Sequence, residues 1–212
     1  FSSFSFYYSH QITAGEGGMI ACKKKEDYDL LKTLRAHGWD RDLSKNKNKK
    51  FNFINSGFNL RPLEVSAAIG LNQFKRLSKM MSIRTYNRNK IIKTLQKAHN
   101  WNEQFIFFNH NKNLKPSWFG FPLLINPKLE KKKNKFLEFL NKNNLETRPI
   151  ISGNFVNQPA IKLYDIKYNK YELKNSNEID KRGFFIGLPT VKLSQEKLDK
   201  ISDLLLNITN LK

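Results

Sequence analysis

The segment SFYYSH at residues 5–10, together with GEGG at residues 15–18, decides how the fold is interpreted. The first segment is rich in Phe and Tyr, and an apolar run, Met19 to Cys22, follows the second. Aromatic and apolar runs joined by a glycine-rich turn predict two β-strands. His10 would then lie at a strand end, where the backbone can come close to a ligand. From the residues alone, His10 is either part of a site or a core or capping histidine.

Farther along the chain, the spacing of apolar residues predicts further helices. Leucines at helical spacing predict a helix over residues 26–37, and a polar loop follows it. Pro62 is placed to begin the next helix, which should bury an apolar stripe, and another helix is expected over residues 79–97. The expected stripe consists of Leu63, Ala67, Leu71, Phe74 and Leu77.

The C-terminal part of the chain has the pattern of an α+β module, in which strands and helices alternate irregularly. Its predicted elements are a strand over residues 118–125, a helix over 127–143 capped by Asn126, a strand over 145–151, an irregular segment over 152–177, a strand over 183–187 and a helix capped by Ser194. The caps are assigned because Asn and Ser side chains accept hydrogen bonds from the first amides of a helix.

The composition excludes several classes of protein. The sequence has 212 residues, of which 39% are hydrophobic and 13% aromatic, as expected for a folded chain. It has no run of 18 apolar residues, so we expect no membrane span. Cys22 is the sole cysteine and no basic leader precedes the first aromatic run, which predicts a cytoplasmic protein without disulfides. The four histidines lack metal-ligand spacing, so no metal is expected.

Ordered blocks along nearly the whole chain resemble the DegT/StrS family of sugar aminotransferases, which are enzymes that depend on pyridoxal 5′-phosphate (PLP). The blocks are Ser5–Phe6 with Gly15–Gly18, Leu34–Trp39, Gly57–Glu64, Trp118–Phe121, Glu146–Ile150 and Ser152–Phe155. The resemblance implies an α/β fold, the C-terminal part of a fold-type-I PLP-dependent transferase. Residues 1–85 would form the end of the large PLP-binding domain with its linking helix, and residues 86–212 a small α+β C-terminal domain.

We also expect the chain to be a C-terminal fragment, because by resemblance about half of the family's fold would precede it. The missing half would supply the carboxylate that contacts the pyridine nitrogen and the aromatic side chain that stacks on the cofactor ring. We therefore expect no independent activity from these residues alone.

His10 occupies the position at which the family carries its cofactor-binding lysine. An imidazole cannot form the Schiff base that a lysine forms, and histidine at this position marks the sugar 3-dehydratase subgroup. The resemblance implies that PLP is converted by L-glutamate to pyridoxamine 5′-phosphate and held without a covalent bond. His10 would be the base in removing the 3-hydroxyl of a nucleotide-linked 4-keto-6-deoxy sugar, which gives a 3,6-dideoxy sugar for cell-surface polysaccharide. One cysteine cannot hold the iron–sulfur cluster of other members, which favours a GDP-linked sugar.

The resemblance implies roles for five further residues. Ser5 would donate to the cofactor phosphate; the alternative is a polar residue on an exposed strand face. Asn59 would reach the phosphate in the neighbouring subunit, which implies a homodimer with shared sites; the alternative is an Asn in a left-handed turn. His37, Glu146 and Arg148 would bind substrate. The alternatives are a helix cap for His37 and a surface ion pair between Glu146 and Arg148.

The formal net charge of +20 allows a different interpretation, a basic binding module. Lysines cluster at residues 23–25, 45–50 and 131–135. These clusters lie among Asn, Asp and Glu, and no nucleic-acid-binding motif accompanies them, so no nucleic-acid partner is expected. A basic surface would attract an anionic nucleotide sugar. A 4-aminotransferase of the same family and a non-catalytic fragment remain alternative functions.

Overall fold

The computed structural model describes residues 1–43, 50–111 and 113–211 of the chain. Residues 45–49 of the predicted lysine cluster therefore lie outside the described part. Among the described residues, no helix combines the length and the apolar character needed to cross a membrane.

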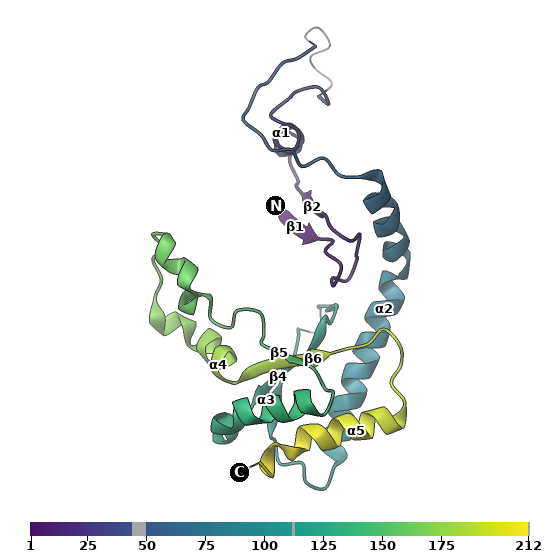
Figure 1. Ribbon diagram of the computed structural model, residues 1–212, viewed down its shortest axis with the longest axis vertical. Coiled ribbons are helices and arrows are strands. Elements are labelled where there is room, and N and C mark those ends of the chain that lie inside the picture. Colours follow the sequence, from purple (N-terminus) through teal and green to yellow (C-terminus); the bar gives the residue numbers. More distant parts are fainter. Residues whose placement is uncertain (44–49, 112, 212) are drawn as a thin grey trace. The chain divides into compact units, whose positions relative to one another are not determined.

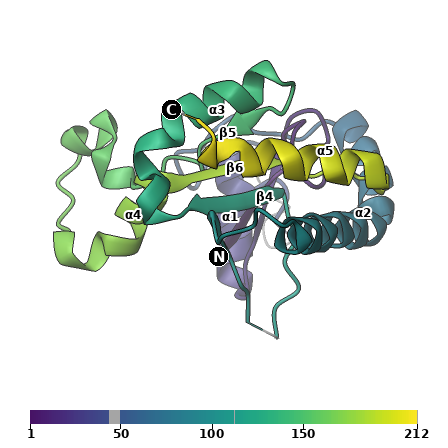
Figure 2. The same ribbon diagram turned by 90° about the horizontal axis from the view of Figure 1, so that it is seen from below.

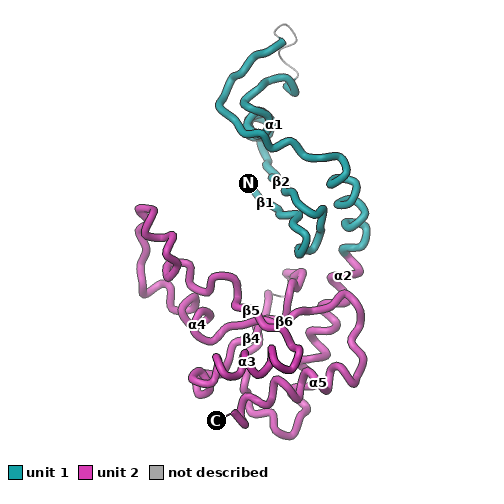
Figure 3. The backbone as a smooth tube through the Cα atoms, viewed as in Figure 1, with its two compact units in different colours: residues 1–77 teal, residues 78–212 magenta. Residues whose placement is uncertain are grey.

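The chain divides into two compact units, residues 1–77 and residues 78–212 (Figure 3). The border between them falls inside helix α2, Glu64–Lys97. The domain border predicted at residues 85 and 86 falls inside the same helix. Whether the units are the end of a large domain and a small domain of one enzyme stays a prediction.

The first unit begins with the expected pair of strands. β1 (Ser2–Ser5) and β2 (Gly18–Ala21) pair antiparallel, with Ser5 opposite Gly18. β1 ends five residues before His10, because the chain turns after Ser5 and does not continue as a strand. Helix α1 (Lys25–Arg35) follows, close to its predicted range. Phe4 and Met19 are each 48% exposed, so this two-stranded sheet buries little apolar surface.

α2 is one helix of 34 residues, where the sequence predicted two. Residues 71–97 contain neither Gly nor Pro, so nothing in the chain breaks the helix where a gap was expected. Pro62 lies two residues before the helix and not in its first turn. The predicted buried stripe is wrong, because Leu63, Leu71 and Phe74 are 69%, 65% and 61% exposed.

The second unit contains a four-stranded antiparallel sheet in the order β3–β4–β6–β5 (Figures 1 and 2). Helices α3 and α5 lie on the same face of this sheet (Figures 1 and 2). The elements are β3 (Phe105–Phe107), β4 (Gly120–Ile125), the 3-10 helix η1 (Pro127–Lys132), α3 (Lys133–Lys142), β5 (Thr147–Arg148), the 3-10 helices η2 (Phe155–Asn157), η3 (Pro159–Leu163) and η4 (Lys170–Leu173), α4 (Lys174–Arg182), β6 (Gly183–Gly187), α5 (Gln195–Leu206) and the 3-10 helix η5 (Asn207–Thr209).

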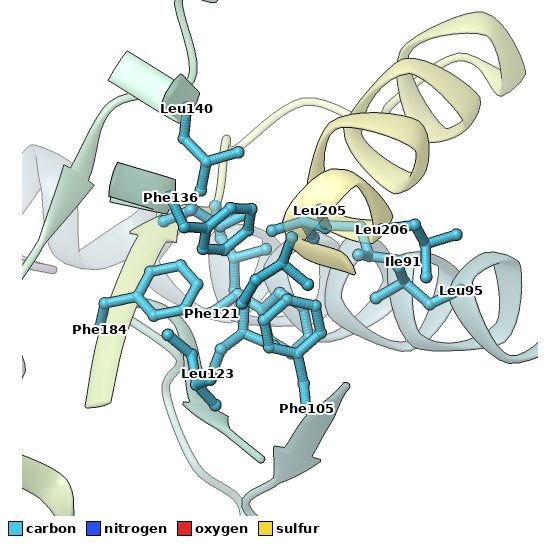
Figure 4. Close-up of a cluster of buried hydrophobic side chains, with 14 of the residues drawn as sticks. Ile91, Leu95, Phe105, Phe121, Leu123, Phe136, Leu140, Phe184, Leu205 and Leu206 are labelled. Carbon is cyan, nitrogen blue, oxygen red and sulfur yellow. The ribbon is translucent and has the colours of Figure 1, made fainter. Parts of the chain in front are cut away.

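The core of the second unit fills the space between the sheet and its helices (Figure 4). Alternate residues of the central strands are buried, as in a sheet with one covered face. Helices contribute side chains at helical spacing, which place them on one side of each helix. The fully or almost fully buried residues are Phe105 of β3, Phe121, Leu123 and Ile125 of β4, Phe184 and Ile186 of β6, Leu188 after β6, Ile91 and Leu95 of α2, Phe136 and Leu140 of α3, Leu198, Leu205 and Leu206 of α5, and Ile208 of η5.

The structure confirms the predicted α+β pattern of the second unit and differs from it in detail. β6 has the predicted range, and the Asn126 and Ser194 side chains accept from the amides of Lys128 and Lys197. The strand predicted over residues 145–151 is reduced to two residues, and the predicted helix 127–143 begins as a 3-10 helix. β3 and α4 were not predicted.

Candidate active site

His10 lies in a short loop whose base is closed by Phe6. The Phe6 amide donates to the Gly17 carbonyl at 2.9 Å, and the Phe6 carbonyl accepts from the Ala14 amide at 2.9 Å. Within the loop, the His10 amide donates to the Tyr7 carbonyl at 3.0 Å. The imidazole is exposed. The prediction that His10 lies at a strand end is therefore wrong. His10 lies in a loop that is fixed at its base by the strand pair.

Ser5 is the last residue of β1 and is exposed. Its hydroxyl oxygen accepts a hydrogen bond from the Tyr7 amide at 3.4 Å. Because the hydroxyl acts as acceptor in this bond, its hydrogen can be donated elsewhere. The alternative that placed Ser5 on an exposed strand describes its position correctly, and its proposed contact with phosphate stays a prediction.

The second group of predicted residues lies where the end of α1 meets residues 57–61. The Phe58 amide donates to the Leu34 carbonyl at 2.7 Å, and the Leu60 amide donates to the Arg35 carbonyl at 2.9 Å. In the other direction, the His37 amide donates to the Phe58 carbonyl at 2.9 Å. The last carbonyls of a helix lack partners within it, so this segment satisfies groups that α1 leaves open. We call this arrangement the crossing.

Two glycines allow the chain segments of the crossing to approach each other. A Cβ atom on Gly57 would overlap the Gly38 amide, and one on Gly38 would overlap the Asn55 carbonyl. Gly38 also has a φ of 78°, which glycine adopts most easily. Its carbonyl accepts from the Ile54 amide at 2.9 Å, so both sides of this residue are in backbone contact. His37 precedes it with a φ of 63°, an uncommon conformation for a residue with a side chain.

His37 and Asn59 both project from the crossing and are exposed. Asn59 forms a β-bridge with Ala36 and is not in the left-handed region, so the alternative of a left-handed turn is wrong. The His37 ring nitrogen Nε2 lies 3.2 Å from Nη2 of Arg61. Because a guanidinium can only donate, this nitrogen must accept, and the ring proton belongs on Nδ1. Arg61 was not predicted as a site residue, although it lies within the block 57–64 that carries the resemblance.

Glu146 and Arg148 belong to the second unit and form the ion pair that the sequence left open as an alternative. Oε1 of Glu146 accepts from Nε of Arg148 at 2.9 Å, and Nη2 of Arg148 lies 2.9 Å from the same oxygen. The two side chains are 73% and 59% exposed, so the pair contributes at most about 1 kcal/mol to stability. The charges are thus available at the surface, and their role in substrate binding stays a prediction.

The six predicted residues divide between the two units. Ser5 and His10 lie on the strand pair and its loop, His37 and Asn59 lie on the crossing, and Glu146 and Arg148 lie at β5. Over residues 1–43, 50–111 and 113–211, no group of three or more His, Cys, Asp or Glu side chains could hold a metal ion.

Comparison with known proteins gives a consistent set of relatives. GDP-4-keto-6-deoxy-D-mannose 3-dehydratase of Escherichia coli O55:H7 is 34% identical over 207 residues, which cover 92% of this chain and 51% of the relative. A solved structure of GDP-4-keto-6-deoxymannose-3-dehydratase, a His-to-Asn variant with bound GDP-perosamine, matches with a TM-score of 0.85 and 31% identity. The match covers 96% of this chain and 54% of the chain in the solved structure.

Another structure of such a dehydratase, with a trapped PLP-glutamate geminal diamine, has a TM-score of 0.84 and 32% identity over 96% of this chain and 54% of that one. The chain spans about half the length of the curated relatives it matches. The predicted resemblance and the predicted α/β fold are confirmed. Residues 1–206 match the family model, and the chain belongs to the DegT/DnrJ/EryC1/StrS aminotransferase family.

Proposed function

We propose that the protein is a PLP-dependent dehydratase that removes the 3-hydroxyl of a GDP-linked 4-keto-6-deoxy sugar. His10 carries the proposal, since it stands where the family pattern has a lysine. Relatives that are 34% and 32% identical and are named GDP-4-keto-6-deoxy-D-mannose 3-dehydratase support it. The product would be a 3,6-dideoxy sugar for cell-surface polysaccharide.

The residues of the first unit fit a cofactor that carries a phosphate. Ser5 has a hydroxyl hydrogen that its bond with the Tyr7 amide does not use. Asn59 presents an exposed amide, and both groups are of the kind that donates to phosphate oxygens. We propose that Ser5 contacts the phosphate in its own subunit and Asn59 the phosphate in the other subunit of a homodimer.

His10 would act as a proton carrier and not as a covalent anchor. When bound, pyridoxamine 5′-phosphate supplies the amine that condenses with the sugar ketone and a ring that accepts electrons. The neutral imidazole of His10 removes a proton from the methylene carbon that bears this amine. The same imidazole, now protonated, gives the proton to the departing 3-hydroxyl, which leaves as water. L-Glutamate is the proposed amino donor, and the dehydratase structure with a PLP-glutamate adduct supports that choice.

The remaining predicted residues supply charge for an anionic substrate. Arg148 is exposed at β5, where its Nε and Nη2 both lie 2.9 Å from one oxygen of Glu146, and a guanidinium can also hold phosphate oxygens. We propose that the ion pair between Arg148 and Glu146 separates when the nucleotide sugar binds and that both side chains then contact the substrate. His37, with its accepting nitrogen held by Arg61, would present Nδ1–H to the substrate.

The test is incubation of the full-length protein with GDP-4-keto-6-deoxymannose, PLP and L-glutamate. We expect a deoxygenated ketosugar and ammonia, measured by mass spectrometry and an ammonia assay. His10→Asn should lower the rate by about 100-fold or more, because it removes the proton carrier. His10→Lys should abolish dehydration.

The matched control is His99→Asn, which changes an exposed histidine of the second unit. It should keep the wild-type rate. A stable amino sugar as the product of the wild-type protein would contradict the dehydratase and favour a 4-aminotransferase. Full activity of His10→Asn would show that another residue is the base.

A further inference from the structure

Tyr7 makes two separate contacts with His10. Its carbonyl accepts the His10 amide at 3.0 Å, which closes a turn between the two residues. Its ring lies 5.8 Å from the imidazole, measured between ring centroids, with an interplanar angle of 68°. This edge-to-face arrangement is one of the two that aromatic rings prefer. One residue thus holds both the backbone and the side chain of His10.

Tyr7 is itself held on its other sides. It directly follows Phe6, whose amide and carbonyl both bond to the segment across the loop. Its ring lies 4.4 Å from the ring of Tyr8, at an interplanar angle of 62°. Burial raises the pKa of Tyr7, and a hydrogen bond with Tyr8 and electrostatic repulsion from Tyr8 and Glu16 raise it further. The phenol therefore stays neutral at physiological pH, and the ring acts on His10 by packing.

We propose that Tyr7 is a positioning residue that sets the plane of the His10 imidazole. The inference rests on the proposed role of His10 as the proton carrier. His10 is exposed and lies in a loop, so the strand pair fixes its backbone, whereas the orientation of its ring depends on the groups that the ring contacts, and the Tyr7 ring is one of these. A base must point a nitrogen at the proton it removes, and a misplacement of about 1 Å can cost about 100-fold in rate. The edge of the Tyr7 ring restricts that rotation.

Two substitutions separate the ring of Tyr7 from its hydroxyl. Tyr7→Phe keeps the ring and should leave kcat within about 3-fold of wild type, since the hydroxyl is not needed for the packing. Tyr7→Leu removes the ring and should lower kcat by about 10- to 100-fold without a matching change in KM for the nucleotide sugar. Tyr171→Leu is the control, because Tyr171 is 92% exposed and lies in the second unit.

A spectroscopic measurement tests the contact without relying on activity. With 13C at the histidine ring carbon Cε1, the His10 signal is assigned by its loss in His10→Asn. Tyr7→Leu should move this signal, because the ring current of Tyr7 is removed, while Tyr7→Phe should not. The signals of His37, His99 and His110 should stay in place, which separates a local effect from a general change in structure.

The wild-type protein provides a second measurement that needs no variant. A nuclear Overhauser effect is expected between the ring protons of Tyr7 and those of His10, and its absence would overturn the proposal even if Tyr7→Leu fails to fold. An unmoved His10 signal with wild-type kcat in Tyr7→Leu would also overturn it. If His10→Asn stays fully active, the proposed function fails. The NMR measurements still show independently whether the rings of Tyr7 and His10 are in contact.

Discussion

At the scale of single residues, Arg182 shows how a buried cation is accommodated in the second unit. It is only 4% exposed, and Glu178, one helical turn earlier in α4, accepts from its Nε and Nη2 atoms at 2.9 and 2.6 Å. The remaining nitrogen, Nη1, donates to the Ile125 carbonyl at the end of β4. The side chain therefore links α4 to the sheet, and its charge is balanced by one carboxylate.

This pairing predicts a dependence of stability on pH. The hydrogen bond from Arg182 lowers the pKa of Glu178, and the charges of Arg182, Lys181 and Lys174 lower it further. The stabilisation is therefore complete above the ordinary glutamate pKa of about 4.3 and is lost as the pH falls through the lowered value. Denaturant unfolding of wild type and Glu178→Gln between pH 7 and pH 2.5 should show a difference that shrinks in acid.

The exposed Glu138, which lies in α3, provides a matched control for this measurement. Glu138→Gln should show no such pH-dependent difference from wild type. A constant difference between wild type and Glu178→Gln across the whole pH range would contradict the assignment.

At the scale of elements, the crossing holds His37 and Asn59 through backbone contacts. Gly57→Ala would push a methyl group into the Gly38 amide, where only backbone can yield. Overpacking of this kind costs about 1–3 kcal/mol, and here it should also separate the two segments. We expect a lower free energy of unfolding in denaturant titration and shifted NMR signals for His37.

Gly187→Ala is the control, because nothing lies within 4 Å of a Cβ at that position. It should leave stability nearly unchanged. Equal stability of Gly57→Ala and Gly187→Ala would mean that the crossing relaxes easily.

Local signals explain which elements the sequence predicts well. The capping residues Asn126 and Ser194 are chemical features of the chain itself, so the elements beside them were predicted almost in place. α4 lacks such a signal, since its sequence KNSNEIDKR has one apolar residue. Its position depends on Arg182 and on the sheet, which a local pattern does not contain.

The candidate site was predicted by residue type more than by geometry. The motif around His10 identified a functional position, but the loop that holds it is closed by backbone bonds of Phe6 that depend on strand pairing. The contact of Arg61 with His37 depends on the crossing, whose partners are 21 to 25 residues apart in sequence. Contacts between separate segments are not visible in the spacing of side chains.

At the scale of the whole molecule, the two units differ in how they bury apolar side chains. Among the described residues, Ala14 is the one buried hydrophobic residue of the first unit, and all others belong to the second. In the first unit, Phe4 and Ile20 are about half exposed, and Leu63 and Phe74 are mostly exposed. The core that stabilises residues 78–212 is thus separate from the proposed cofactor-binding residues.

This division predicts where core substitutions act. Phe136 is fully buried and packs against Phe105 and Phe184, so Phe136→Ala should cost about 3–5 kcal/mol. Hydrogen exchange should show the loss of protection in the second unit. Leu163→Ala changes a residue that is 80% exposed and should have little effect. Equal protection in the two variants would contradict the assignment of this core.

Some of the lysines that give the chain its net charge of +20 also hold parts of the fold together. Lys132 donates to the Thr209 carbonyl at 2.8 Å, and Lys133 donates to the Asp180 carbonyl at 2.9 Å. Burial lowers the pKa of Lys133, an effect that the charges of Asp180 and Glu130 partly offset. Two lysines of the cluster 131–135 therefore join segments of the fold.

The crossing has a consequence for how this protein can change over evolutionary time. Residues 39–56 connect the two segments of the crossing. The hydrogen bond from the Ile54 amide to the Gly38 carbonyl holds the two ends of this connection together. Lengthening a connection whose ends are already joined costs little free energy, since the closure entropy grows only slowly with length. The Asp40 amide donates to the Asn52 carbonyl at 3.2 Å, so the segments next to the crossing are also paired. Insertions and deletions can therefore accumulate between these paired segments while His37 and Asn59 keep their positions, and homologues should vary in length there.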